Sequence, residues 1–123
     1  MKFELDDQHA DRLITAYHAG WIKIGEMRIE RPCLVTIDGV LEASLPNSPA
    51  ELEVAHFAAV VERRPEIVLL GTGARQQFAD YGITQHLAGV GIGLETMDTG
   101  AACRSYNILV GEGRSVAAML YMI

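Results

Sequence analysis

The feature that most constrains the fold is a short apolar segment that runs directly into two glycines. Residues 67–70 are uninterrupted aliphatic side chains, and Gly71, Thr72 and Gly73 follow them. A run of this length is typical of a strand buried on both faces, and glycines directly after such a strand are typical of ligand-binding turns in α/β proteins. The segment therefore predicts a strand that ends at Leu70 and a turn at Gly71–Gly73, where the main chain can approach a bound group closely.

The part of the chain after residue 65 alternates predicted strands with predicted helices. Strands are expected at residues 67–70, 90–95 and 115–123, and helices at residues 84–88 and from Thr96 or Asp98 to Gly111. Ala102, Tyr106 and Leu109 recur at helical spacing and predict the apolar face of the last helix. This β-α-β-α-β order favours right-handed crossovers and partly parallel pairing, so the sequence predicts an α/β fold with a mixed sheet.

The first 45 residues predict several short antiparallel strands in succession. Alternating or apolar segments lie at residues 12–17, 21–25, 27–31, 33–37 and 40–45. Asp38 and Gly39 are a hairpin turn signal between the last two of these segments. The N-terminal part is therefore expected to form an antiparallel meander.

A longer helix is expected between this meander and the strand at residues 67–70. Ser48 is a suitable N-cap, Pro49 suits the first helical position, and Glu51 completes a capping box. One apolar face is expected from the residues at helical spacing, which are Val54, Phe57, Ala58 and Val61. Arg63 and Arg64 suit a helix C-terminus, and Pro65 predicts the end of the helix.

Size and charge limit the classes of function. With 123 residues the chain is expected to form a single domain, residues 1–123, with its own core. A formal net charge of −6 without a long basic cluster argues against nucleic-acid binding. Residues 1–7 resemble no signal or transit peptide, and the apolar segment 116–123 is too short to cross a membrane. We therefore expect a cytoplasmic protein with no membrane insertion.

The glycine turn contains only part of a dinucleotide-binding fingerprint. Gly71 and Gly73 match the first two glycines of GxGxxG, but Gln76 occupies the third position. Glu95 follows at about the distance of the acid that holds a ribose, yet Gly82 and Gly89 interrupt the segment between them. No GKS or GKT sequence is present, which excludes a P-loop. A tight turn that requires positive φ is favoured over nucleotide binding, and no cofactor is expected.

A second group of polar residues surrounds the start of the last helix. Thr96 or Asp98 is expected to cap it. Arg104 and Asn107 share one helix face and are expected either to reach an anion at the glycine turn or to pair with Asp98 and cap a loop. The capping role is favoured over catalysis, and the pairing with Asp98 is favoured over anion binding.

The cysteines and histidines predict no catalytic or metal centre. Cys33 and Cys103 lie seventy residues apart without CxxC spacing, which suits a reducing compartment. The four histidines show neither HxH nor HExxH spacing, and none is adjacent in sequence to a cysteine. Cys103 is therefore expected to be a small residue of the core, and no metal site and no catalytic set are expected.

Three segments together resemble the Mth938-like domain family. They are the glycine turn at residues 69–73, the Met-Asp-Thr segment within residues 91–99, and the Arg-Ser-Tyr-Asn helix within residues 101–109. The family includes bacterial and archaeal proteins of unassigned function, a mitochondrial complex I assembly factor and the adipogenesis-associated Mth938-domain protein. The resemblance implies a three-layer α/β fold with mixed sheets, no established enzymatic activity, and assembly or interaction roles. The chain is expected to differ from the mitochondrial branch in lacking a transit peptide, and it has Ser105 where the family commonly has Arg-Thr-Tyr-Asn.

Two functional hypotheses follow from these observations. The first is a non-enzymatic protein that binds another protein or assists its assembly, with a homo-oligomer compatible with this role. The alternative is a domain that binds an anion or a nucleotide-like small molecule. Its expected ligand-binding residues are Gly71, Thr72, Gly73, Glu95, Arg104 and Asn107.

Overall fold

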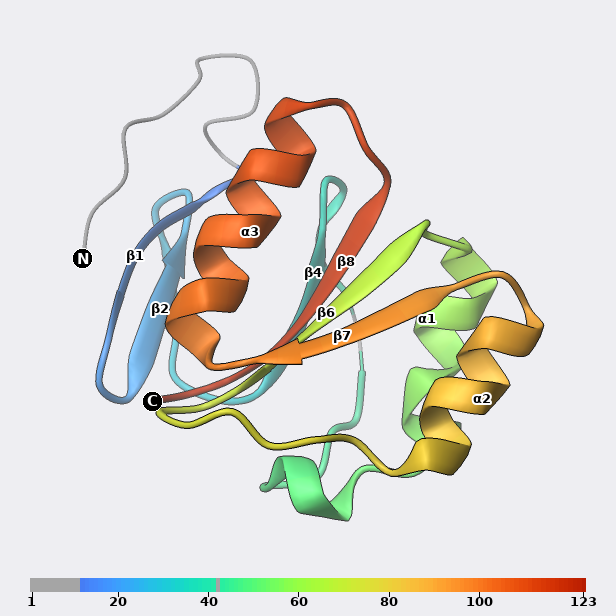
Figure 1. The fold of residues 1–123 in the computed structure, drawn as a ribbon. Helices are drawn as coiled ribbons and strands as arrows, with labels where there is room; N and C mark the ends of the chain where they lie inside the picture. The colour runs from blue at the N-terminus through green and yellow to red at the C-terminus, as the bar shows by residue number, and fades with distance from the viewer. Residues whose placement is uncertain (1–11, 42) are drawn as a thin grey trace.

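The computed structural model describes residues 12–41 and 43–123, which form two β-sheets and three α-helices (Figure 1). The strands are β1 (Ile14–His18), β2 (Trp21–Ile24), β3 (Met27–Ile29), β4 (Cys33–Thr36), β5 (Gly39–Leu41), β6 (Ile67–Thr72), β7 (Gly93–Met97) and β8 (Val116–Tyr121). The helices are α1 (Ala58–Arg63), α2 (Tyr81–Gly89) and α3 (Thr99–Gly111), with 3₁₀ turns η1 (Pro49–Glu51) and η2 (Val54–Phe57). The predicted α/β class is confirmed.

The predicted N-terminal strands are confirmed, but they divide between two sheets. β1, β2 and β3 form a three-stranded antiparallel sheet, with Trp21 opposite His18 and Ile29 opposite Ile22. The chain then passes Pro32, which has no amide hydrogen to continue the ladder, and β4 and β5 join the second sheet. The expectation of one continuous meander is therefore wrong at Pro32, because β4 finds its partner in β8.

The second sheet is mixed and has the order β5-β4-β8-β6-β7. β6 pairs in parallel with both β7 and β8, whereas β8 and β4 are antiparallel. This arrangement confirms the predicted partly parallel pairing of the second half of the chain. β8, the last strand in the chain, occupies the middle of the sheet and is buried along its whole length.

The five-stranded sheet is the central layer of three (Figure 1). α3 and the three-stranded sheet cover one face and share an apolar core with it, in which Ile14, Leu69 and Tyr106 are buried. α1 and α2 cover the other face around a second core, which contains Phe57 and Leu87. Alternate residues of β6 and β8 point into the two cores, which is why both strands consist of nearly uninterrupted apolar residues.

The segment before β6 does not form the single helix that the sequence predicts. Ser48 does cap a turn, since its hydroxyl accepts from the amide of Ala50 at 3.2 Å. However, η1 ends at Glu51, and the capping box forms instead between Glu53 and His56. The break allows Leu52 to reach the core, which a continuous helix with the predicted face would not bury.

The predicted apolar face of this segment is correct only in part. Phe57 is fully buried, as expected, but Val54 is 38% exposed and Ala58 is exposed as well. Val60 takes a buried position in their place. The face is rotated because the helical spacing restarts after the break, so that α1 has its own phase.

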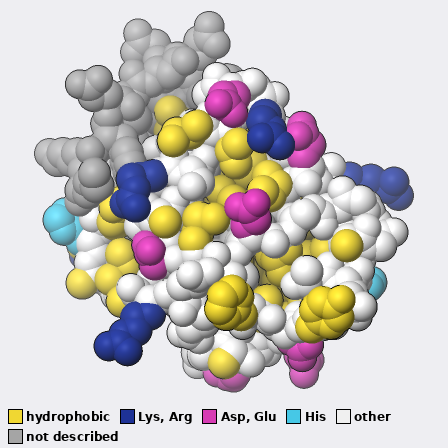
Figure 2. All heavy atoms as spheres, viewed as in Figure 1, with side chains coloured by type: hydrophobic (Ala, Val, Ile, Leu, Met, Phe, Trp, Pro, Cys, Tyr) yellow, Lys and Arg dark blue, Asp and Glu magenta, His cyan; other side chains and the backbone are white. Residues whose placement is uncertain are grey.

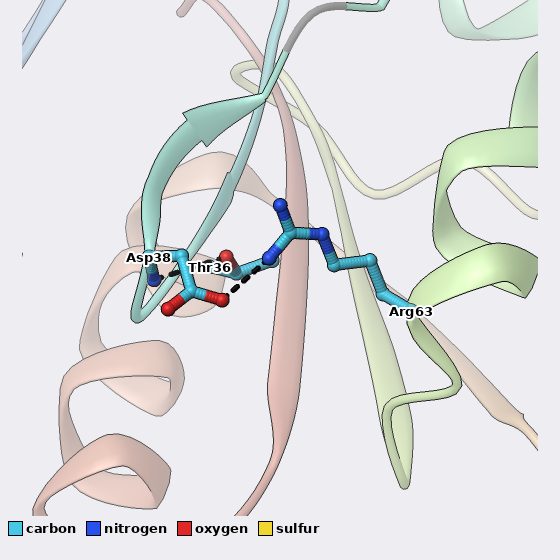
Figure 3. Close-up of polar contacts among 3 residues, drawn as sticks. All are labelled: Thr36, Asp38 and Arg63. Atoms are coloured by element: carbon cyan, nitrogen blue, oxygen red, sulfur yellow. Dashed lines mark hydrogen bonds and ion pairs between the residues drawn. The ribbon is translucent and has the colours of Figure 1, made fainter.

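An ion pair fastens the end of α1 to the β4–β5 hairpin (Figure 3). Arg63 donates to the carboxylate of Asp38, and the amide of Asp38 donates to the hydroxyl of Thr36 at 3.2 Å. Arg64 ends the helix in the left-handed conformation with φ 51°, directly before Pro65. This exposed contact ties α1 to the β5 end of the five-stranded sheet, and β7 is the strand at the other end.

Candidate functional site

The predicted glycine turn begins two residues later than expected. β6 continues through Gly71 and Thr72, so Gly71 is a strand residue rather than part of a turn. A Cβ atom at Gly71 would lie 3.0 Å from both Leu120 Cδ2 and Thr99 Oγ1, and so the residue is glycine because α3 packs closely there. Gly73, with φ 97°, is the residue that turns the chain. The predicted need for positive φ is therefore confirmed at Gly73 alone.

The turn is held by Thr99 at the start of α3. The amide of Gly73 donates to the Thr99 hydroxyl at 2.8 Å, and the amide of Thr99 donates to the carbonyl of Gly73 at 2.9 Å. The same hydroxyl donates to the carbonyl of Tyr121 at the end of β8, at 2.6 Å. Thr99 is fully buried. One side chain thus joins the ends of β6 and β8 to the N-terminus of α3.

The hydroxyl of Thr72 organises the loop after the turn in the same way. It lies 2.6 Å from the carbonyl oxygen of Arg75 and 3.1 Å from that of Met97, and it accepts from the amide of Gln77 at 3.0 Å. The polar groups of Thr72 and Gly73 are therefore occupied by the protein itself. An anion bound at this turn would have to displace these internal hydrogen bonds.

Asp98 is the N-cap of α3, which decides between the two caps that the sequence allows. Its carboxylate accepts from the amide of Ala101 at 2.9 Å. A carboxylate at this position occupies the electropositive end of the helix, where an anionic ligand would otherwise be attracted.

Arg104 and Asn107 contact β1 rather than the glycine turn or Asp98. Arg104 donates to the hydroxyl of Tyr17 at 2.6 Å. Asn107 accepts from the amide of Ile14 at 2.9 Å and donates to its carbonyl at 2.8 Å, as a neighbouring strand would. The expected pairing with Asp98 is not found among the hydrogen bonds of the described residues, and the anion-binding role stays a prediction. The sequence could not reveal these contacts, because the partner strand lies more than 80 residues earlier in the chain.

The six residues predicted to bind a ligand therefore lie in three places. Gly71, Thr72 and Gly73 are at the end of β6, Arg104 and Asn107 lie along β1, and Glu95 is on β7. Glu95 is exposed, and it takes part in none of the ion pairs found within residues 12–41 and 43–123. Their joint role in ligand binding stays a prediction.

The β7 edge is the surface that sequence reasoning missed. We use this name for the unpaired side of β7 together with the shallow depressions on its two faces. One depression, of about 540 Å³, lies between β7 and the start of α2 and is lined by Gln76, Phe78, Ala79, Tyr81, Thr84, Leu94, Glu95 and Thr96. The other, of about 260 Å³, lies toward α3 and is lined by Ile67, Leu69, Glu95, Ser105, Ile108, Leu109 and Arg114.

Large hydrophobic side chains are exposed on both sides of this edge. Phe78 is 86% exposed and Tyr81 is 71% exposed on the α2 side, while Ile108 is 61% exposed on the α3 side. Figure 2 shows hydrophobic side chains at the surface above and below the line that β7 follows in Figure 1. Apolar groups gathered around an open strand edge are typical of interaction sites. The sequence contains one signal for this surface. Phe78 and Tyr81 are two aromatic residues in a segment that shows neither helical nor strand periodicity.

The two cysteines are unsuited to nucleophilic chemistry. Both are free and buried, as expected for Cys103. Burial raises the pKa of each thiol from its ordinary value of 9.0 to about 12, even though Arg31 and Arg104 act in the opposite direction. Both groups are therefore neutral thiols at physiological pH. The part of the chain that the structure describes also contains no cluster of three or more His, Cys, Asp or Glu residues able to hold a metal ion.

Residues 14–121 match a protein family described as a protein of unknown function, DUF498/DUF598. The chain belongs to this family. Among solved structures, a crystal structure from Bordetella parapertussis is 33% identical with a TM-score of 0.83, covering 90% of this chain and 95% of that chain. A Bordetella pertussis protein described as a Mth938-like domain is 30% identical with a TM-score of 0.81, covering 99% and 92%. The predicted Mth938-like family and its fold are thus confirmed.

Two relatives of the family carry names that describe a role or a location. NADH dehydrogenase (ubiquinone) 1 alpha subcomplex assembly factor 3 of Danio rerio is 30% identical over 112 residues, which is 90% of this chain but 64% of that protein. The 13 kDa major membrane protein of Francisella tularensis is 29% identical over 80% of both chains. In the present protein, none of the helices within the described residues has the length and apolar character needed to cross a bilayer.

Proposed function

We propose that this protein acts by binding another protein and assisting the assembly of a complex, without catalysing a reaction. The similarity to an assembly factor supports an assembly role in general terms. The observation that carries it is the hydrophobic surface at the β7 edge, where Phe78, Tyr81 and Ile108 are largely exposed. In contrast, the donors at the glycine turn already have partners within the protein.

A comparison of captured proteins from native lysate tests this function. Tagged wild-type protein is expected to retain one partner in stoichiometric amount under gentle conditions. A Phe78→Ser, Tyr81→Ser double variant should lose this partner, because it removes the exposed aromatic surface without opening a core. Glu62→Gln, an exposed change near β5 at the opposite edge of the sheet, is the matched control. Failure of the wild-type protein to retain any stoichiometric partner would count against an assembly role.

We propose the cytoplasm as the location of the protein, since the free buried thiols suit a reducing compartment. The membrane-protein name of the Francisella relative makes a direct measurement worthwhile. Cell fractionation should recover the protein with soluble markers. Recovery with membranes that persists after washing at high salt would contradict this location.

Small-molecule binding is the second candidate, and one observation favours it. Gly73 lies where the carboxyl ends of three mutually parallel strands, β7, β6 and β8, come together, which is the usual position of ligand sites in α/β sheets. A thermal-shift screen with nucleotides and phosphorylated metabolites tests it, because a ligand of the native state raises the melting temperature. The absence of a shift with every compound would remove this candidate.

A further inference from the structure

We propose that the β7 edge binds an extended segment of a partner protein, which adds to the sheet as a sixth strand and places a lysine or arginine opposite Glu95. This inference rests on the proposed function, and it specifies the surface and the chemistry of the partner segment. Strand addition is a common mode of peptide recognition, in which main-chain hydrogen bonds supply affinity and pockets for alternate side chains supply specificity.

The hydrogen bonds of β7 show which of its main-chain groups are open. The amide of Gly93 donates to Glu66 at 3.1 Å, and the carbonyl of Met97 accepts from the Thr72 hydroxyl at 3.1 Å, so both residues point toward β6. Since main-chain groups alternate along a strand, Leu94 and Thr96 point to the opposite side. Consistent with this, the carbonyl of Thr96 accepts from the Gln76 side chain at 3.0 Å. The groups available to an added strand are thus the amide and carbonyl of Leu94 and the amide of Thr96.

The two depressions of the β7 edge fit the alternating side chains of such a strand. Leu94 and Thr96 face the depression beside Phe78 and Tyr81, because Leu94 packs in the same core as α2. Glu95 is one residue out of phase and lies level with Leu69, on the face toward α3. Successive side chains of an added strand would therefore enter the two depressions in turn. Both depressions have apolar walls, so the segment should carry apolar residues at alternate positions.

The charges around the edge determine the polar residue of the partner segment. Among the described residues, Glu95 is the only charged one that lines the depression on the α2 side. On the α3 side, Arg114 forms an ion pair with Glu66 at 3.2 Å. Glu95, Glu66 and Arg114 together therefore carry one net negative charge. A cation directly across from Glu95 would compensate this charge, since opposite charges in cross-strand positions attract.

The same charge disfavours a second copy of this chain as the occupant. Full antiparallel overlap of β7 with its own copy would place Glu95 opposite Glu95, and like charges in that position repel. The formal net charge of −6 on each copy adds to the repulsion. Charges on edge strands are a common protection against self-association, and here the charge still admits a basic partner.

A synthetic peptide provides the test. The peptide Ser-Val-Leu-Lys-Leu-Val-Ser places lysine opposite Glu95, leucines in the α2-side depression and valines on the α3 side. When this peptide is titrated into the full chain, the NMR signals of the Leu94 and Thr96 amides should shift, with a dissociation constant of roughly 0.1–1 mM. The same peptide with glutamate in place of lysine should bind about 5-fold more weakly, and Glu95→Lys should reverse this preference.

A proline variant separates strand addition from other binding modes. Thr96→Pro removes an amide that points away from β6, so the fold should be retained while the peptide loses its site. Thr96→Ala keeps the amide and is the matched control. The inference fails if the peptides bind equally, if the shifts lie elsewhere, or if the wild-type chain forms a dimer that Thr96→Pro abolishes. If the lysate partner binds Thr96→Pro unchanged, the proposed function stands and this inference is wrong.

Discussion

Thr99 offers a sharp test of how the end of β6 is held. Its hydroxyl accepts from the amide of Gly73 and donates to the carbonyl of Tyr121 in a fully buried position. Valine has nearly the same shape, so Thr99→Val leaves both main-chain groups without a partner and creates no large cavity. Each unsatisfied buried group costs about 1–3 kcal/mol, and we expect a loss of about 2–4 kcal/mol in the free energy of unfolding.

Thermal and urea denaturation measure this loss. For a domain of this size, a loss of about 2–4 kcal/mol corresponds to a fall of about 8–16 °C in Tm. Thr99→Ser is the control, because it keeps the hydroxyl and removes one methyl group at a cost of about 1 kcal/mol. The main-chain bond from Thr99 to Gly73 is common to all three proteins. If valine were no more destabilising than serine, the hydroxyl bridge could not be what holds this junction.

Three further changes test other parts of the structure. Asn107→Ala should cost about 1–3 kcal/mol and increase hydrogen exchange in β1, because both main-chain bonds to Ile14 are lost; unchanged exchange would contradict this role. Gly71→Ala should cost about 1–3 kcal/mol by urea denaturation, since its Cβ atom meets Leu120 and α3 at about 3.0 Å. Burial raises the pKa of Cys103 from 9.0 to about 12, so the unfolded chain loses that proton first and the free energy of unfolding should fall as pH rises from 9 toward 12. Cys103→Ala should show a smaller fall, and an equal fall in both proteins would exclude this thiol as a cause.

The predictions that succeeded depend on local chemistry. The cap at Asp98, the buried face of α3 at Ala102 and Tyr106, and the final strand follow from residues close together in sequence. The resemblance to the Mth938-like family likewise depends on short segments in a fixed order. Patterns of this kind are visible without knowledge of what packs against them.

The features that were missed depend on partners far away in the chain. Gly71 is explained only by Leu120 and Thr99, and Asn107 only by Ile14 on β1. The division of the N-terminal strands at Pro32 likewise reflects the pairing of β4 with β8, some 80 residues later. Period and propensity contain no information about such contacts, because a side chain has the same sequence neighbours whichever sheet it joins.

The position of β8 in the middle of the sheet has a consequence for synthesis on the ribosome. β4 and β6 touch β8 on either side and do not pair with each other, so the two halves of the sheet have no shared ladder until β8 arrives. Because β8 follows every other strand in the chain, the sheet can close only after residue 121 has left the exit tunnel. Nascent chains should therefore remain protease-sensitive until that point and then become resistant in one step.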